Sequence, residues 1–201
     1  YFKTAFESLG GTIVTEEQFQ TNQSDFKAIL TNIKSANPDI IFAPSSITTA
    51  PLIIKQAREM GITAVIAAGD TWENATIIEN AGADAEGVVL STFFDEAAPA
   101  NDEAASFIKG FKEYLVSIGE PDIIPAVSAL GYDAYLCLLQ AIKDADSTDP
   151  AAVRDALENV SVTGVTGDIT FNETGDANKS LAFIKTIKDG QFQFLTTTTL
   201  E

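Results

Sequence analysis

Residues 39–70, DIIFAPSSITTAPLIIKQAREMGITAVIAAGD, decide the fold. The stretch contains two short runs, Asp39–Ala43 and Ala64–Ala68, that are apolar on both faces, as buried parallel strands are. Between them the spacing of apolar residues predicts a helix over Thr49–Met60, and Gly61 is typical of a helix end. A strand, a helix and a second strand at this spacing predict a βαβ unit with parallel strands.

Helices and strands are expected to alternate on either side of this unit. Ser24-Asp25 suits the start of a helix that stops at Asn37-Pro38. The first ten residues resemble the second half of a helix, so the sequence is expected to lack its start. The other elements expected in this half are a partial helix over Tyr1–Gly10, a strand over Thr12–Thr15, a helix over Ala75–Asn80 and a strand over Gly87–Ser91.

The alternation changes after the fourth strand. Phe93–Asn101 contains a proline and small acidic residues and is expected to cross between lobes. Helices are then expected over Glu103–Ser117, Ala126–Ala145 and Asp149–Asn159, followed by strands over Gly167–Phe171, Leu181–Ile187 and Phe192–Thr197. Strands, then helices, then a β tail indicate two lobes joined by several crossings.

Composition narrows the class of function. The 201 residues include 29 acidic and 12 basic side chains, a formal charge of −17, which excludes most nucleic-acid binding. Histidine is absent and Cys137 is the only cysteine, so the usual general base and the usual metal clusters are missing. No apolar run approaches the roughly 18 residues of a membrane span. No phosphate-binding loop or nucleophile elbow is present, and we expect no catalytic residue, cofactor or metal.

A ligand is expected at the carboxyl ends of the strands. In open α/β sheets, ligands bind where strands lead into loops and helix starts. This rule selects the loops Pro44–Thr48 and Gly69–Glu73. Because the two preceding strands are expected to be parallel neighbours, both loops should lie at the same edge of the sheet.

The side chains of these loops suit recognition of a small polar molecule. Asp70 offers a carboxylate for an ammonium group, and Trp72 offers a flat apolar wall. Ser45, Ser46 and Thr48 offer hydroxyls at a helix start, which favours a negative group. Structural interpretations stay open: Asp70 as a helix cap or turn residue, Trp72 as loop packing, and the serines as caps. Elsewhere, Asp84, Glu86, Asp95 and Glu96 are expected to be solvated surface residues.

A series of short motifs, in order along the chain, resembles the branched-chain amino-acid-binding proteins. These are type I solute-binding proteins of ATP-driven importers. The motifs are Asp25-Phe26, Asn37-Pro-Asp-Ile-Ile-Phe42, Gln56-Ala-Arg-Glu-Met-Gly61, Ala68-Gly-Asp-Thr-Trp72, Asn80-Ala-Gly82, Ala85-Glu-Gly87, Gly131-Tyr-Asp-Ala134, Gly164-Val-Thr-Gly-Asp-Ile-Thr-Phe171 and Lys188-Asp-Gly190. Each motif is loose by itself, and their order and spacing carry the resemblance over essentially the whole chain.

The resemblance implies an α/β fold of the periplasmic binding protein type I. That fold has two Rossmann-like lobes with parallel sheets and three crossings, and it closes over a small ligand. The chain resembles the carboxyl-terminal three-fifths of such proteins, so the first lobe is expected to be incomplete. Residues 1–93 and 182–201 would form the second, C-terminal lobe, and residues 94–181 a remnant of the first.

The resemblance also implies a function and its residues. Asp70 matches the acidic position that binds the α-ammonium group, shortened from glutamate. Ser46 stands where such proteins often carry an aromatic residue, which leaves branched-chain specificity open and makes Trp72 a candidate for the apolar wall; Ser45 completes the expected ligand-binding set. The expected partners are an amino acid or analogue and the membrane permease of an ABC transporter, with no nucleic acid, no membrane span and an extracytoplasmic location.

Two other functions use a similar fold. The first is the ligand-sensing domain of a receptor or transcriptional regulator, for which no DNA-binding segment is visible. The second is a small flavodoxin-like enzyme, which requires an acid–base or phosphate site that the sequence does not show. Since fold alone does not determine function, the loop residues carry the preference for solute binding.

Overall fold

The computed structural model describes residues 2–199; Tyr1, Leu200 and Glu201 lie outside the described part. The chain divides into two compact units, here called unit 1 and unit 2. Within the described part, unit 1 runs to Leu90 and includes Thr186–Phe192. Unit 2 comprises Ser91–Lys185 and the residues from Gln193 onward. Each unit is therefore built from separated pieces of sequence. The assignment of residues 1–93 and 182–201 to a second lobe, and of 94–181 to a first, stays a prediction.

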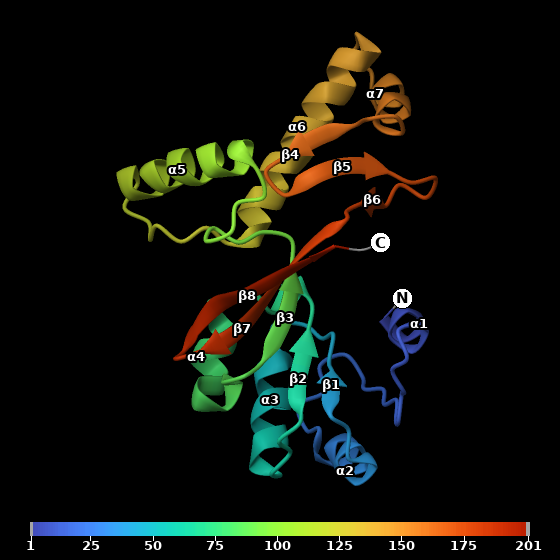
Figure 1. The fold of residues 1–201 in the computed structure, drawn as a ribbon, viewed down its shortest axis with the longest axis vertical. Coiled ribbons are helices and arrows are strands. Elements are labelled where there is room, and N and C mark those ends of the chain that lie inside the picture. The colour runs from blue at the N-terminus through green and yellow to red at the C-terminus, as the bar shows by residue number, and fades with distance from the viewer. Residues whose placement is uncertain (1, 200–201) are drawn as a thin grey trace. The chain divides into compact units, whose positions relative to one another are not determined.

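The βαβ unit predicted for residues 39–70 is confirmed. Strands β1 (Ile40–Phe42) and β2 (Val65–Ala68) pair in parallel, with Ile41 opposite Ile66, and α3 (Ala50–Glu59) connects them. In the described part of the chain these strands belong to a five-stranded sheet of order β1-β2-β3-β7-β8 (Figure 1). The other three strands are β3 (Val89–Thr92), β7 (Leu181–Lys188) and β8 (Gln191–Thr199).

The helices of unit 1 cover this sheet with their apolar sides. Phe26, just before the second helix, and Leu30 within it are buried together with Ile54 of α3, Ile66 of β2 and Trp72. The left-handed backbone of Asn37 ends the second helix, as its position before a proline predicts. The helical segments of this unit besides α3 are α1 (Phe2–Ser8), α2 (Lys27–Ala36), η1 (Asp70–Trp72), α4 (Ala75–Ala81) and η2 (Gly82–Ala85).

The prediction of a strand over Thr12–Thr15 is wrong. The segment has no secondary structure, Val14 is exposed, and none of its backbone groups is bonded to another described residue. β-Branched residues favour a strand only where a neighbouring strand accepts their backbone hydrogen bonds. No described strand pairs with this segment, so its β-forming composition has no effect.

Unit 2 is built mainly from three of the chain's described helices and a small sheet. Helix α5 (Asp102–Ser117) begins where the Asn101 side chain accepts a hydrogen bond from Ala104 N, and α6 (Ala126–Ala145) follows. Asp149 caps α7 (Pro150–Leu157) by accepting from two backbone N–H groups. The described residues also form a three-stranded antiparallel sheet of β4 (Val162–Gly164), β5 (Gly167–Phe171) and β6 (Ala177–Asn178).

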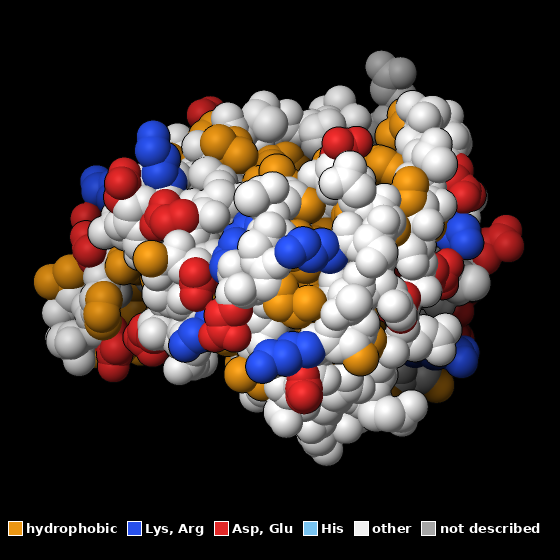
Figure 2. All heavy atoms as spheres, turned by 90° about the horizontal axis from the view of Figure 1, so that it is seen from below, with side chains coloured by type: hydrophobic (Ala, Val, Ile, Leu, Met, Phe, Trp, Pro, Cys, Tyr) orange, Lys and Arg blue, Asp and Glu red, His pale blue; other side chains and the backbone are white. Residues whose placement is uncertain are grey.

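Charged side chains are distributed without a large basic region on the face seen in Figure 2. Basic side chains there are interspersed with acidic ones, as the excess of 29 acidic over 12 basic residues would suggest. No helix among residues 2–199 is both long enough and apolar enough to cross a membrane.

Candidate functional site

The loops that follow β1 and β2 lie together, as their parallel pairing predicts. The indole Nε1 of Trp72 donates a hydrogen bond to the carbonyl oxygen of Ser45 at 2.9 Å, and Thr71 Oγ1 lies 3.5 Å from the same oxygen. Ser45 belongs to the first loop and Thr71 and Trp72 to the second. One carbonyl oxygen therefore links the two loops, and the expectation that they share an edge of the sheet is confirmed.

Three hydroxyl groups lie close together in the first loop and at the start of the helix that follows it. Ser46 Oγ lies 2.9 Å from Thr48 Oγ1 and 3.2 Å from Thr49 Oγ1, while the Ser46 carbonyl oxygen accepts from Thr49 N and Ala50 N. Ser46 and Thr48 are exposed and Thr49 is buried. The Ser46 hydroxyl does not cap the helix with a backbone N–H bond. It keeps a donor or acceptor available at the start of α3, where the helix dipole favours negative groups.

Asp70 is the first acidic residue of the second loop. It begins η1, its side chain is exposed, and its carbonyl oxygen accepts from Glu73 N at 2.9 Å. The carboxylate makes no hydrogen bond or ion pair with any residue that the structure describes. The alternative interpretation of Asp70 as a side-chain cap is therefore unsupported, whereas its place in a 3₁₀ turn supports the interpretation as a turn residue. The geometry leaves a carboxylate that can accept hydrogen bonds from a cation.

Trp72 is fully buried in the core of unit 1. Its ring packs within the apolar cluster while its N–H reaches the Ser45 carbonyl, a common arrangement for a buried tryptophan. The interpretation of Trp72 as a packing residue is thus supported. Its role as an apolar wall stays a prediction, because a fully buried indole reaches a ligand only if the surrounding loop moves.

The Ser45 hydroxyl is unusual among the described residues. Its oxygen is buried and has no hydrogen-bond partner in the described chain, although the Ser45 carbonyl bonds to the second loop. A buried polar atom without a partner destabilises a fold by roughly 1–3 kcal/mol. Ser45 therefore carries unused hydrogen-bonding capacity beside Ser46. Two shallow hollows elsewhere, against α2 and α3 and against α5 and α6, contain none of the four candidate residues.

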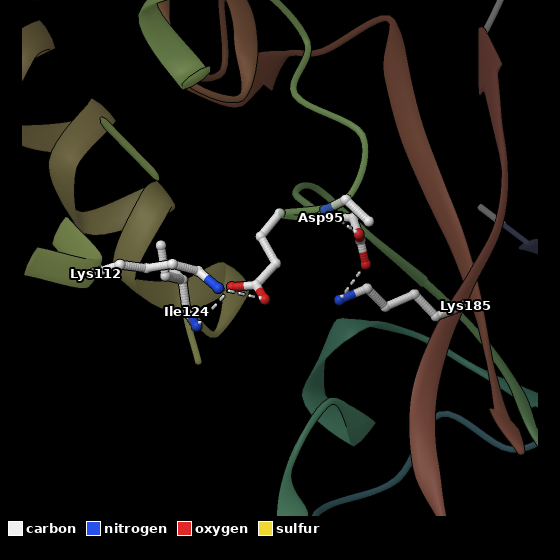
Figure 3. Close-up of polar contacts among 6 residues, drawn as sticks. Asp95, Lys112, Ile124 and Lys185 are labelled. Atoms are coloured by element: carbon white, nitrogen blue, oxygen red, sulfur yellow. Dashed lines mark hydrogen bonds and ion pairs between the residues drawn. The ribbon is translucent and has the colours of Figure 1, made fainter. Parts of the chain in front are cut away.

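Two acidic residues of Phe93–Asn101, here called the crossing segment, are bonded within the protein. This corrects the expectation that Asp95 and Glu96 are solvated surface residues. Asp95 is buried, and its Oδ2 lies 2.7 Å from Lys185 Nζ in an ion pair whose side chains are 7% and 8% exposed (Figure 3). Its Oδ1 accepts from Ala97 N at 2.8 Å. Removal of one partner of such a pair is costly because the other charge stays buried. Asp95 therefore fastens the crossing segment to β7.

Glu96 fastens the same segment to the α5 side of unit 2. Its Oε1 lies 3.0 Å from Lys112 Nζ, and its Oε2 accepts from Ile124 N at 3.2 Å (Figure 3). These side chains are about one-third exposed, so solvent screens the ion pair more than the one at Asp95. Glu86, also expected to be plain surface, is exposed but accepts from Asp189 N and Gly190 N in the β7–β8 turn.

Asp133 was not predicted from the sequence to have a special role. Its place among apolar residues of α6 could have indicated a buried carboxylate. The carboxylate is buried and accepts from Val165 N at 2.7 Å and from Thr166 N at 2.9 Å. Lys179 Nζ reaches Thr166 Oγ1, and burial lowers the pKa of Lys179. An aspartate among apolar helix residues must find such partners. Its role is to hold the β4–β5 turn against α6. Among residues 2–199, no group of three or more His, Cys, Asp or Glu residues is placed to hold a metal ion.

Comparison with known proteins places these features in context. The family described as "Periplasmic binding protein" matches residues 1–191. Leu/Ile/Val-binding protein homolog 1 of Brucella abortus is 30% identical over 176 residues, which are 87% of this chain and 45% of that protein. A binding protein for leucine, isoleucine, valine, threonine and alanine from Pseudomonas aeruginosa is 24% identical over 174 residues. The chain thus spans about half the length of the curated relatives it matches.

Solved structures show the same likeness. A leucine-binding protein from Thermotoga maritima has a TM-score of 0.85 and 32% identity, over 98% of this chain and 55% of that one. A branched-chain amino-acid transporter substrate-binding protein from Streptococcus pneumoniae, solved with isoleucine, has a TM-score of 0.78 and 25% identity, over 99% of this chain and 55% of that one. The expected type I α/β fold is confirmed by these neighbours.

Proposed function

Because the chain belongs to the periplasmic binding protein family, we propose that it is the solute-binding component of an ATP-driven importer. We propose further that it binds an amino acid or a similar small polar molecule that carries an ammonium group. The observation that carries this proposal is the exposed carboxylate of Asp70, which has no partner among the described residues and stands on the loop that Trp72 joins to the hydroxyl-bearing first loop. The names of the relatives support the same class of ligand.

Each candidate residue has a role in this proposal. Asp70 accepts hydrogen bonds from the ammonium group, and Ser46 offers an exposed hydroxyl 2.9 Å from that of Thr48. Ser45 supplies a second hydroxyl, whose bonding capacity is unused within the described chain. Trp72 holds the loops together through the Ser45 carbonyl, and it supplies an apolar wall once the loop around it moves. Binding of this kind makes and breaks no covalent bond, so under this proposal the protein is not an enzyme and needs no cofactor.

The importer context completes the proposal. A family named for its periplasmic members suggests an extracytoplasmic location. The expected protein partner is the membrane permease, which receives the solute from the binding protein. The charge of −17 argues against a nucleic-acid partner.

The decisive variant is Asp70→Asn, which removes the charge and keeps the shape of the side chain. Titration calorimetry is done with leucine, isoleucine, valine, alanine and threonine on the longest natural form of the protein. We expect the parent to bind at least one of these amino acids and Asp70→Asn to lose that binding. The loss should be on the order of 2–5 kcal/mol, since the ammonium would keep its desolvation cost without its partner.

Asp39→Asn is the matched control. Asp39 is exposed and immediately precedes β1, at the end of the strand opposite the hydroxyl loop. We expect this variant to bind as the parent does. Equal affinities of Asp70→Asn and the parent would remove Asp70 from the site, and binding of an analogue that lacks the ammonium group with undiminished affinity would refute the proposed ligand class.

A further inference from the structure

The turn between β7 and β8 contains the only Asp-Gly pair of the sequence, Asp189-Gly190, and Asn-Gly does not occur. These two residues alone connect the strands. Both have a left-handed backbone, with φ of 54° and 69°, which is what a two-residue hairpin turn of type I′ requires. Asp and Gly are among the residues that adopt this conformation most readily. Both are exposed, so water reaches the turn.

Glu86 binds the backbone of this turn from a distant part of the sequence. Its Oε2 accepts a hydrogen bond from Asp189 N at 3.0 Å, and its Oε1 accepts from Gly190 N at 2.7 Å. One carboxylate therefore holds both amide groups of the turn, and hydrogen bonds to a charged acceptor are the stronger kind. Glu86 and the turn belong to the motifs Ala85-Glu-Gly87 and Lys188-Asp-Gly190, which the proposed binding of a solute does not use.

An Asp-Gly bond is a chemically weak point of a polypeptide. The glycine nitrogen can attack the side-chain carboxyl carbon of the neutral aspartic acid, and glycine favours this because it has no Cβ to hinder the approach. A C–N bond forms, the nitrogen loses its proton, the carboxyl loses its hydroxyl, and the two leave together as water. Water then opens the cyclic imide at one of its two carbonyl carbons. One opening restores aspartate, and the other gives isoaspartate, in which the main chain runs through the former side chain. The water released is taken up again, so no reagent is consumed.

The contact with Glu86 opposes this reaction in two ways. The Gly190 nitrogen must turn toward the Asp189 side chain, yet its N–H is directed at Glu86 Oε1. The nitrogen must also lose its proton, and a negative charge beside it disfavours that loss. We propose that Asp189 is a site of isoaspartate formation, and that Glu86 is the residue that keeps this modification slow in the folded protein.

The modification would act on the five-stranded sheet. Isoaspartate adds one carbon atom to the main chain of a turn whose geometry sets the register of β7 and β8. Ile187, two positions before Asp189, donates to the Val88 carbonyl and accepts from Gly87 N, each at 2.9 Å. Modified protein should therefore unfold at a lower urea concentration than unmodified protein. This inference does not depend on the ligand or on Asp70.

The test is the rate of isoaspartate formation after Glu86→Ala. The longest natural form of the protein and this variant are kept at physiological temperature in weakly acidic buffer, where neutral aspartic acid is populated. Isoaspartate is counted with an isoaspartate-specific methyltransferase and located by peptide mapping. We expect it to form at residue 189 about tenfold faster in the variant, because both hydrogen bonds to a charged group are lost. In urea the two proteins should react at the same, faster rate.

Glu59→Ala is the matched control, because Glu59 is an exposed glutamate of α3 in the same unit and does not bond to the turn. It should react at the parent's rate. If Glu86→Ala does not melt cooperatively, Glu86→Gln replaces it, since the amide keeps the shape and loses the charge. Equal rates in the folded parent and the variant would overturn the protective role. So would a slower variant, which would mean that the carboxylate assists removal of the proton. No isoaspartate at residue 189 in the urea-unfolded parent would remove Asp189 as the site.

Discussion

At the scale of single residues, burial decides which polar and nucleophilic groups are chemically available. Asp70 is exposed and has no partner among the described residues, whereas Asp95 and Asp133 are enclosed and bonded. The first is therefore free to meet a ligand, and the other two hold the chain in place. The same distinction applies to Cys137 and Lys185, and each supports a measurement.

The Cys137 thiol should be unreactive in the folded protein. Burial is the main cause that raises its pKa, so the thiolate, which is the reactive species, is scarce at neutral pH. We expect modification by a disulfide reagent at pH 7 to be slower than in urea-unfolded protein by roughly tenfold or more. Raising the pH through the thiol's ordinary range should not restore fast labelling of the native state. Complete labelling within the mixing time, without urea, would contradict this description of α6.

The Asp95–Lys185 ion pair should contribute more to stability than the Glu96–Lys112 pair. Lys185→Met leaves the Asp95 carboxylate buried without its cation, and we expect unfolding in urea to require about 3–5 kcal/mol less free energy. Lys112→Met, in a pair about one-third exposed, should cost only ~0–1 kcal/mol. Equal losses from the two variants would show that the burial of Asp95 is wrongly described.

At the scale of elements, the joint between α6 and the β4–β5 turn depends on close approach. A Cβ atom at Gly164 would lie 2.3 Å from Asp133 Oδ1, so the turn can reach the carboxylate only because this position has no side chain. The two loops of the candidate site are joined by a comparable contact, from Trp72 to the Ser45 carbonyl. In both places one main-chain group and one side chain set the spacing between two elements.

Gly164→Ala should therefore destabilise unit 2. The added methyl group must displace the Asp133 carboxylate from Val165 N and Thr166 N, and we expect a loss of about 1–3 kcal/mol in urea unfolding. Gly110→Ala in α5 is the matched control, because nothing lies within 4 Å of its added Cβ. That change should stabilise the helix by about 0.5–1 kcal/mol. A neutral Gly164→Ala would mean that the turn does not press on Asp133.

At the scale of the whole molecule, local patterns predicted more than long-range pairings. The βαβ unit of residues 39–70 and the meeting of its two loops follow from contiguous sequence, and both are confirmed. The prediction of a strand over Thr12–Thr15 was wrong because a strand needs a neighbouring strand, which no local pattern reveals. Asp95 was misjudged for the same reason, since its partner Lys185 lies 90 positions away in the chain. The burial of Trp72 likewise depends on packing that spacing alone does not define.

The order of strands in the five-stranded sheet has a consequence for synthesis of the protein. Strand β3 pairs with β7, yet residues 93–180 must be made between the end of β3 and the start of β7. At 5–20 residues per second, a ribosome needs roughly 5–20 s for that interval. During this time the nascent chain holds β1, β2 and β3 with the edge of β3 unpaired. An emerging chain of this kind exposes an unpaired strand edge, which is open to wrong pairing with other chains until β7 has been made.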